Sequence, residues 1–273
     1  MTSSANSGAS GAEGEDGLGL AENEAAGLWE AHADWWQSEF TEGADPEYVE
    51  QILPLALQLL DGYETILDLG CGEGQIARLL AERSFGTKVI GVDPTVSQID
   101  AAMKRGGTAA FGAAGASALP HPDSSFDAVL ACLVFEHIDP LDPAVAEVAR
   151  VLRPGGRFAF FLNHPLLQTP GSGWIDDHMV EPADQYWRIG PYLVESASVE
   201  EVQKDVFIPF VHRPLSRYVN ALALNGLAVT EMHEPSPPQG FRDKSPYMDA
   251  AAHIPRLLVL VCERAPWLTE VGS

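Results

Sequence analysis

The chain has 273 residues, 46% of them hydrophobic, and its 39 acidic and 16 basic residues give a formal net charge of -23. This length allows one large domain, or one domain with a cap, around a substantial core. So acidic a chain should repel nucleic-acid phosphates and anionic membranes, which argues against a nucleic-acid-binding protein. The sequence also lacks any run of 18 apolar residues that would predict a membrane span.

The cysteines point to a reducing compartment. Cys71, Cys132 and Cys262 are odd in number, far apart and without a C-x-x-C pair, so reduced thiols are expected rather than a disulfide framework. The N-terminus lacks the basic start and apolar block of a signal peptide. We therefore predict a cytoplasmic protein, and the sequence leaves the oligomeric state open.

The N-terminal part of the chain divides into a tail and a helical region. Residues 1–20 are rich in Ser, Gly, Ala, Glu and Asp and are predicted to be disordered. Residues 21–273 are expected to form a single domain. A first helix should begin near Glu22 or Glu24 and carry aromatic residues three to four positions apart, and a second should run from 45 to 60. The first helix either packs on a sheet edge or covers a ligand pocket as a lid.

A glycine-rich turn follows the first predicted strand. Residues 66–69 are apolar apart from Asp68, three glycines stand at alternate positions (Gly70, Gly72 and Gly74), and residues 75–83 have the apolar spacing of a helix. Strand, tight turn and helix place this turn at the carboxyl end of a strand, where doubly wound sheets bind ligands.

The spacing of the glycines favours one ligand class. A dinucleotide fingerprint reads G-x-G-x-x-G, but Gln75 occupies the position of its third glycine. Asp68 before the turn would repel a pyrophosphate and suit a cationic amino acid. The run resembles the first motif of class I S-adenosylmethionine (SAM)-dependent methyltransferases, which commonly read (V/L)LDxGCGxG.

The second predicted strand, residues 88–93, ends in Asp93, where such folds place an acid against ribose hydroxyls. Thr95 and Gln98 have the spacing of a capping box and should cap the next helix. Asp93 is therefore expected to be free for a ligand.

Further resemblances follow along the chain. The loop 114–120 resembles the family's D-A-x-x-L-P loop, but Gly115 stands where the family has an acid, so backbone groups of 116–118 or the Ser117 hydroxyl would hold adenine. The entry S-F-D-x-V at 125–129 and the turn L-R-P-G-G at 152–156 also match the family. The resemblance implies an α/β, Rossmann-like, seven-stranded, mostly parallel sheet with helices on both faces and an antiparallel last strand.

The same resemblance implies SAM as the cofactor. The residues expected to bind it are Asp68, Gly70, Cys71, Gly72, Gly74, Asp93, Pro94, Thr95, Ala116, Ser117, Ala118, Cys132 and Leu133.

Residues 163–213 interrupt the alternation of strands and helices with many prolines and aromatic residues. We interpret them as a substrate-side insertion, although a small satellite core would have the same composition. His164 and His212 are the candidate general bases, because histidine titrates near neutrality. Some methyl transfers need no base. The acidic residues around His137 match no metal signature, so no metal is expected.

The function expected from the sequence is transfer of a methyl group from SAM to a small-molecule acceptor. Two alternatives remain. One is a non-catalytic SAM-binding regulator or partner subunit. The other is a nicotinamide-dependent oxidoreductase, against which the spacing of the glycines and Asp68 both argue. The acceptor and the methylated atom are not readable from the sequence.

Overall fold

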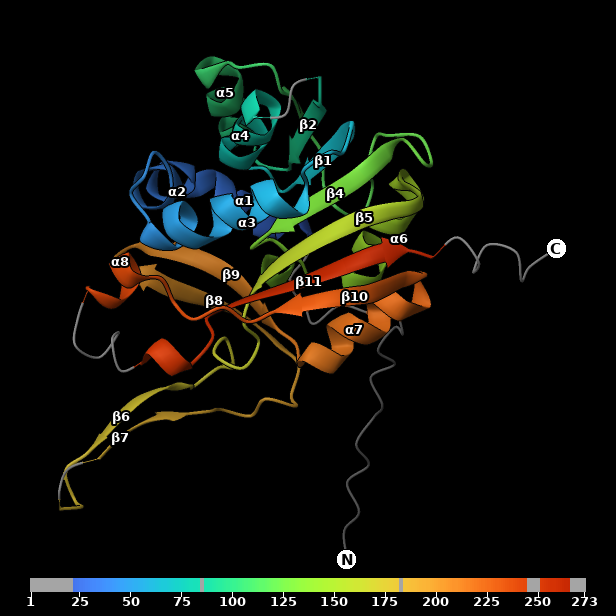
Figure 1. Ribbon diagram of the computed structural model, residues 1–273. Coiled ribbons are helices and arrows are strands. Elements are labelled where there is room, and N and C mark those ends of the chain that lie inside the picture. Colours follow the sequence, from blue (N-terminus) through green and yellow to red (C-terminus); the bar gives the residue numbers. More distant parts are fainter. Residues whose placement is uncertain (1–21, 84–85, 182–183, 245–250, 266–273) are drawn as a thin grey trace, which may run out of the picture.

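The computed structural model describes residues 22–83, 86–181, 184–244 and 251–265. Its main element is a seven-stranded sheet with the order β10-β11-β5-β4-β1-β2-β3 (Figure 1). The strands are β1 Thr65–Leu69, β2 Lys88–Asp93, β3 Ala110–Ala113, β4 Phe126–Cys132, β5 Leu152–Asn163, β10 Leu227–His233 and β11 Leu257–Arg264. In this sheet β11 runs in the opposite direction to the other six strands. The predicted fold class is confirmed.

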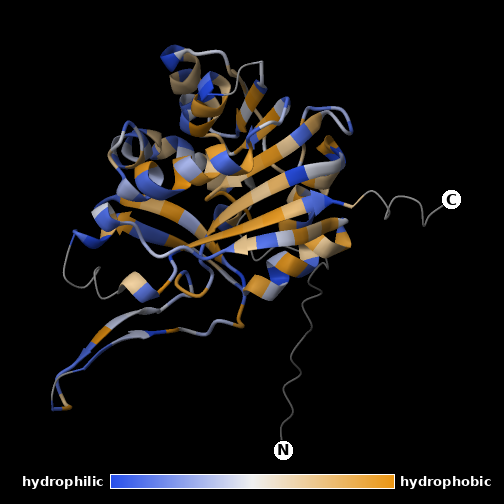
Figure 2. Cartoon of the chain, viewed as in Figure 1, coloured by the Kyte–Doolittle hydropathy of each residue, from blue (hydrophilic) through white to orange (hydrophobic). Residues whose placement is uncertain are grey.

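Apolar cores cover both faces of the sheet, which is why its central strands have few polar residues (Figure 2). Side chains alternate between the faces along a strand. In β5, Phe158 and Phe160 therefore belong to the core under α6 and α7, whereas Phe161 belongs to the core under α3 and α4. The helices are α3 Leu53–Leu59, α4 Gln75–Arg83, α5 Val96–Arg105, α6 Leu141–Val151 and α7 Leu215–Leu224.

The N-terminal helices lie beside the carboxyl end of the sheet. They are α1 Glu22–Ala31, α2 Ala33–Phe40 and a π-helical turn, η1 Tyr48–Ile52, that leads into α3. The first helix begins where it was expected. The predicted tail, residues 1–20, lies outside the described residues.

The segment after β5 forms two hairpins rather than an irregular loop. Strands β6 Gly173–Asp177 and β7 Asp184–Arg188 make an arm that extends from the body of the protein (Figure 1). Strands β8 Ser196–Gln203 and β9 Val206–His212 pair next, and β9 packs against α1 and the short helix η2 Phe135–His137. Short helices α8 Gln239–Arg242 and η3 Ala251–His253 precede β11. Within the described ranges, no helix is long and apolar enough to cross a membrane.

Candidate active site

A cavity opens at the carboxyl ends of β1, β2 and β4, and residues of α1 and α2 form part of its wall. We call it the donor cavity. Ten of the predicted cofactor residues line it: Asp68, Gly70, Cys71, Gly72, Asp93, Pro94, Thr95, Ala116, Cys132 and Leu133. The other three, Gly74, Ser117 and Ala118, are not among its lining residues.

The glycine turn has a backbone that few other residues adopt. Gly70, Gly72 and Gly74 have φ values of 71°, 52° and 79°, in the left-handed region that glycine enters without steric cost. The N–H groups of Gly70 and Cys71 both donate to the Val92 carbonyl, at 2.7 and 3.0 Å. The turn is thus tied to β2. A Cβ on Gly74 would stand 2.5 Å from the Phe111 ring, so this glycine serves packing.

Asp68 contributes a buried carboxylate to the donor cavity. It is 2% exposed, and its Oδ2 has no hydrogen-bond partner among the described residues. Burial raises the pKa of Asp68 to about 7, and the neighbouring charges of Asp93 and Glu73 add to the effect, while the Ala77 N–H and Arg78 oppose it. A cation entering the cavity would meet an acceptor that the protein leaves unpaired.

Asp93 holds the backbone around it as well as facing the cavity. Its Oδ2 accepts the Gly72 N–H and its Oδ1 the Thr95 N–H, both at 2.9 Å. Burial raises its pKa, and these two hydrogen bonds oppose the rise. The expected capping box is absent, because Thr95 makes no side-chain cap and the Gln98 amide oxygen accepts a bond from Gln37. The ribose role of Asp93 stays a prediction.

We expect Asp93→Ala to weaken SAM binding by about 1–3 kcal/mol, because a charge-assisted hydrogen bond to the ligand is lost. Isothermal titration calorimetry would measure the change. Asp93→Asn keeps an acceptor for one backbone N–H and should lose less SAM affinity than Asp93→Ala. Asp100→Ala, on the exposed side of α5, should bind SAM as tightly as the wild type. Unchanged affinity in a folded Asp93→Ala protein would refute the ribose assignment.

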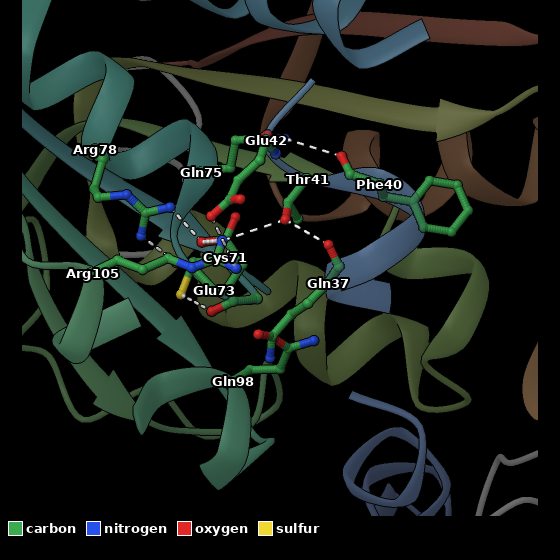
Figure 3. A network of polar contacts seen from close by, with 11 residues as sticks. Gln37, Phe40, Thr41, Glu42, Cys71, Glu73, Gln75, Arg78, Gln98 and Arg105 are labelled. Atoms are coloured by element: carbon green, nitrogen blue, oxygen red, sulfur yellow. Dashed lines mark hydrogen bonds and ion pairs between the residues drawn. The ribbon is translucent and has the colours of Figure 1, made fainter. Parts of the chain in front are cut away.

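A polar network that the sequence did not reveal fastens the N-terminal helices to the glycine turn (Figure 3). The carboxylate of Glu73, 1% exposed, forms ion pairs with Arg78 and Arg105. Arg105 also contacts the Thr41 hydroxyl at 3.3 Å. The Gln75 side chain accepts the Glu42 N–H and donates to the Phe40 carbonyl. Apart from Glu73 and Arg78, these partners are more than 30 residues apart in sequence, so no local pattern could predict their pairing.

A second cavity of ≈ 300 Å³ adjoins the first. We call it the acceptor cavity. The two cavities share five lining residues: Trp29, Trp36, Tyr48, Leu133 and His137. Asn163, the last residue of β5, and Phe210 of β9 also line the acceptor cavity. Its volume falls within the range of small-molecule sites.

His137 borders both cavities and is held in one orientation. Its Nδ1 lies 2.6 Å from the Pro209 carbonyl. Because a carbonyl only accepts, Nδ1 carries the proton and Nε2 is left with a free lone pair. Burial lowers the pKa of His137 to about 4, so the ring is neutral at physiological pH. Trp29 and Phe210 pack against it, with ring centroids 4.9 and 4.8 Å away.

Arg213 supports the loop that carries His137. It is 2% exposed and donates to the backbone carbonyls of Phe135, Ile138 and Asp139. Its guanidinium also lies 3.7 Å from the Asp139 carboxylate and 3.9 Å from that of Glu195, so it is occupied by protein groups.

The two histidines predicted as bases lie elsewhere. His164 Nε2 bonds Glu234 at 2.8 Å, and its Nδ1 accepts the Leu166 N–H. His212 Nε2 lies 2.8 Å from the Tyr192 carbonyl, and its Nδ1 is buried without a partner in the described part of the chain. Neither residue lines the donor or the acceptor cavity.

The sheet order, the glycine turn and the donor cavity define a class I SAM-dependent methyltransferase domain. Residues 67–160 match the family described as the methyltransferase domain. The SAM-dependent methyltransferase from Mesorhizobium loti superposes with a TM-score of 0.67 and 26% identity, covering 78% of this chain and 96% of that one. These likenesses identify residues 67–160 as a methyltransferase domain of the SAM-dependent type. The predicted family and cofactor are confirmed.

Curated relatives match over part of their length. The demethylmenaquinone methyltransferase of Thermus thermophilus is 38% identical over 119 residues, which are 42% of this chain and 53% of the relative. The 27-O-demethylrifamycin SV methyltransferase of Amycolatopsis mediterranei is 33% identical over 146 residues, 51% of each protein. The chain thus spans about half the length of these relatives, so they do not identify its acceptor.

Proposed function

We propose that the protein transfers a methyl group from SAM to a small-molecule acceptor. The observation that carries this proposal is the pair of cavities with a shared wall at the carboxyl end of the sheet. Asp68 in the donor cavity suits the ammonium group of the methionine part of SAM. The relatives named above act on small molecules by their names, which supports the same acceptor class.

The chain's own contribution to the reaction is alignment and exclusion of water. SAM supplies an electrophilic methyl group. Trp29, Trp36 and Leu133 line both cavities, and their apolar side chains would keep water from the transfer. We assign to His137 the role of accepting a hydrogen bond from the acceptor, since its Nε2 is free and the residue borders both cavities.

We expect His137→Ala to lower kcat/KM about tenfold or more without changing SAM affinity, because one oriented hydrogen bond to the acceptor is lost. His164→Ala and His212→Ala are the matched controls, as each removes a buried imidazole outside both cavities. Single-turnover rates and SAM titrations should be recorded for all three. A loss of the single-turnover rate in only His164→Ala or His212→Ala would identify that histidine as the base, as first predicted from the sequence.

The deciding experiment is incubation of the purified chain with methyl-labelled SAM and a metabolite extract. Label in a small molecule supports the enzyme, whereas tight SAM binding with no label in any fraction would favour the alternative of a non-catalytic SAM-binding regulator or partner subunit. Calorimetry with NAD provides a third comparison, and NAD should not bind.

The remaining partner and location predictions belong to this proposal. Cys71, Cys132 and Cys262 are free thiols, as expected in the cytoplasm. The net charge of -23 argues against a nucleic-acid substrate.

A further inference from the structure

Several polar side chains of the acceptor cavity have a hydrogen-bond acceptor left for a ligand. Five side chains that line it can both donate and accept: Tyr48, Gln51, His137, Asn163 and Gln168. Which function faces a ligand depends on the partner that each already holds. The structure identifies such a partner for Gln51, His137 and Asn163.

Gln51, in the cavity wall, has an amide oxygen without a partner among the described residues. Its Nε2 donates to the Ser236 carbonyl at 2.8 Å, which fixes the amide orientation because a carbonyl only accepts. The residue is 8% exposed, and its Oε1 is buried with no partner among the described residues. A buried acceptor without a donor is costly, so a ligand that brings an O–H or N–H group would remove this cost.

Asn163 and His137 present acceptors for the same reason. Asn163 Nδ2 donates to Glu136 Oε1 at 2.8 Å, and the Asn163 N–H donates to the same oxygen at 3.0 Å. The side-chain oxygen of Asn163 is therefore an acceptor left for a ligand. His137 donates a hydrogen bond from Nδ1 to the Pro209 carbonyl. Its Nε2 lone pair has no donor among the described residues.

The charges around the cavity exclude anions. Two carboxylates, Asp45 and Glu47, line it together with a single arginine, Arg256. The Arg256 Nε pairs with Glu47 Oε1 at 2.9 Å, and its guanidinium lies 4.3 Å from the centre of the Phe241 ring. The one cation that the described residues place there is thus already paired, and a ligand carboxylate or phosphate would meet a net negative wall.

The remaining wall is aromatic, and it selects a flat molecule. Six aromatic side chains line the cavity: Trp29, Trp35, Trp36, Phe40, Tyr48 and Phe210. Aromatic rings bind other rings by stacked or edge-to-face contacts. A protonated amine would also suit this wall, but it has no lone pair with which to accept a methyl group.

We infer, on the basis of the proposed function, that the acceptor is a neutral aromatic molecule with two or more hydroxyl groups, one of which is methylated. The hydroxyl oxygen forms the new O–C bond as the S–C bond of SAM breaks, and the electron pair of that bond leaves with sulfur as S-adenosylhomocysteine. The hydroxyl proton passes to His137 Nε2 and then to solvent. A methylated oxonium is far more acidic than an imidazolium, so a weakly basic histidine suffices.

Three matched probes test the inference on the full chain saturated with S-adenosylhomocysteine. The first is caffeyl alcohol, which has two phenolic hydroxyls. The second is 3,4-dimethoxycinnamyl alcohol, in which both phenolic hydroxyls are methylated. The third is caffeic acid, which has a carboxylate in place of the allylic alcohol. Quenching of tryptophan fluorescence reports binding. We expect caffeyl alcohol to bind at least about tenfold more tightly than either of the others. Equal or tighter binding of either other probe, or no binding of caffeyl alcohol, would overturn the inference.

A variant locates the selectivity. Gln51→Met removes the unpaired oxygen with little change in size and should weaken caffeyl alcohol binding about tenfold, leaving the dimethoxy probe unaffected. Gln185→Met, on the exposed hairpin arm, is the control and should change neither. Equal loss for both probes in Gln51→Met would assign the residue a structural role only and remove it from the site.

Labelled SAM separates this inference from the proposed function. Selective binding of caffeyl alcohol without label transfer to it or to any extract component would contradict the proposed function and leave the ligand class standing. Label transfer to a carboxylated or hydroxyl-free acceptor would support the methyltransferase and refute the ligand class.

Discussion

Asp68→Asn should bind SAM about 10²-fold more weakly than the wild type at pH 8, because the replacement removes the negative charge that faces the ligand's ammonium group. The same variant should be more stable without ligand. Burial has raised the pKa of Asp68 from 3.8 to about 7, a shift equivalent to roughly 4 kcal/mol against the charged form. An uncharged asparagine avoids that cost. Calorimetry and chemical denaturation at one pH measure both effects.

The pH dependence gives a second, independent test of Asp68. A raised pKa in the folded state means that protonation stabilises the free protein at low pH, and this stabilisation is lost as the pH rises through about 7. A cationic ligand needs the ionised form. SAM affinity should therefore rise about tenfold from pH 6 to pH 8 and then level off. Binding should also release protons below pH 7.

In Asp68→Asn most of this pH dependence should disappear, apart from a residual contribution of Asp93, whose pKa is also raised. Asp100→Asn on α5 should behave as the wild type. Wild-type affinity that is flat between pH 6 and pH 8 would contradict an ionisation of Asp68 linked to binding.

Gly70→Ala should lower the free energy of unfolding by about 2–5 kcal/mol and abolish measurable SAM binding. Two costs add. An alanine at φ 71° is strained by about 1–2 kcal/mol. Its Cβ would also overlap the Val134 side chain, and overpacking of this kind costs typically 1–3 kcal/mol. Since Val134 lines the donor cavity, any movement that relieves the overlap also changes the site.

Gly62→Ala is the control that separates these costs. Gly62 has a similar φ of 82°, but an added Cβ would meet nothing within 4 Å. The free energy of unfolding of Gly62→Ala should fall only by the backbone strain of about 1–2 kcal/mol. Its SAM affinity should not change. Equal losses for the two variants would mean that the overlap with Val134 is relieved without cost.

Much of the fold could be predicted because its signals are local. The turn that contains Gly70 fixes a strand before it and a helix after it. The burial of β5 and β11 on both faces is visible as unbroken apolar runs. The ends of β3, Ala110–Ala113, are harder to predict, because a short strand with small residues has little periodicity to fix them.

The donor cavity could be predicted in large part for the same reason. Its residues lie immediately after strands, and the carboxyl ends of parallel strands meet at one edge of the sheet. Asp93 lines the cavity as expected, but its hydrogen bond from the Thr95 N–H was not expected. The Thr95 N–H can be satisfied by the Asp93 side chain in an Asx turn or by the Gln98 side chain in a capping box. The sequence alone does not decide between these two arrangements.

The sequence by itself determined the sheet, the glycine turn and the donor side of the site, since each depends on neighbours along the chain. Only the tertiary structure decided the acceptor side. Gln51, His137 and Asn163 come from three distant segments, and which of their atoms faces the cavity is set by Ser236, Pro209 and Glu136. A side-chain amide or imidazole both donates and accepts, so its role is fixed by the partner that folding brings to its other end.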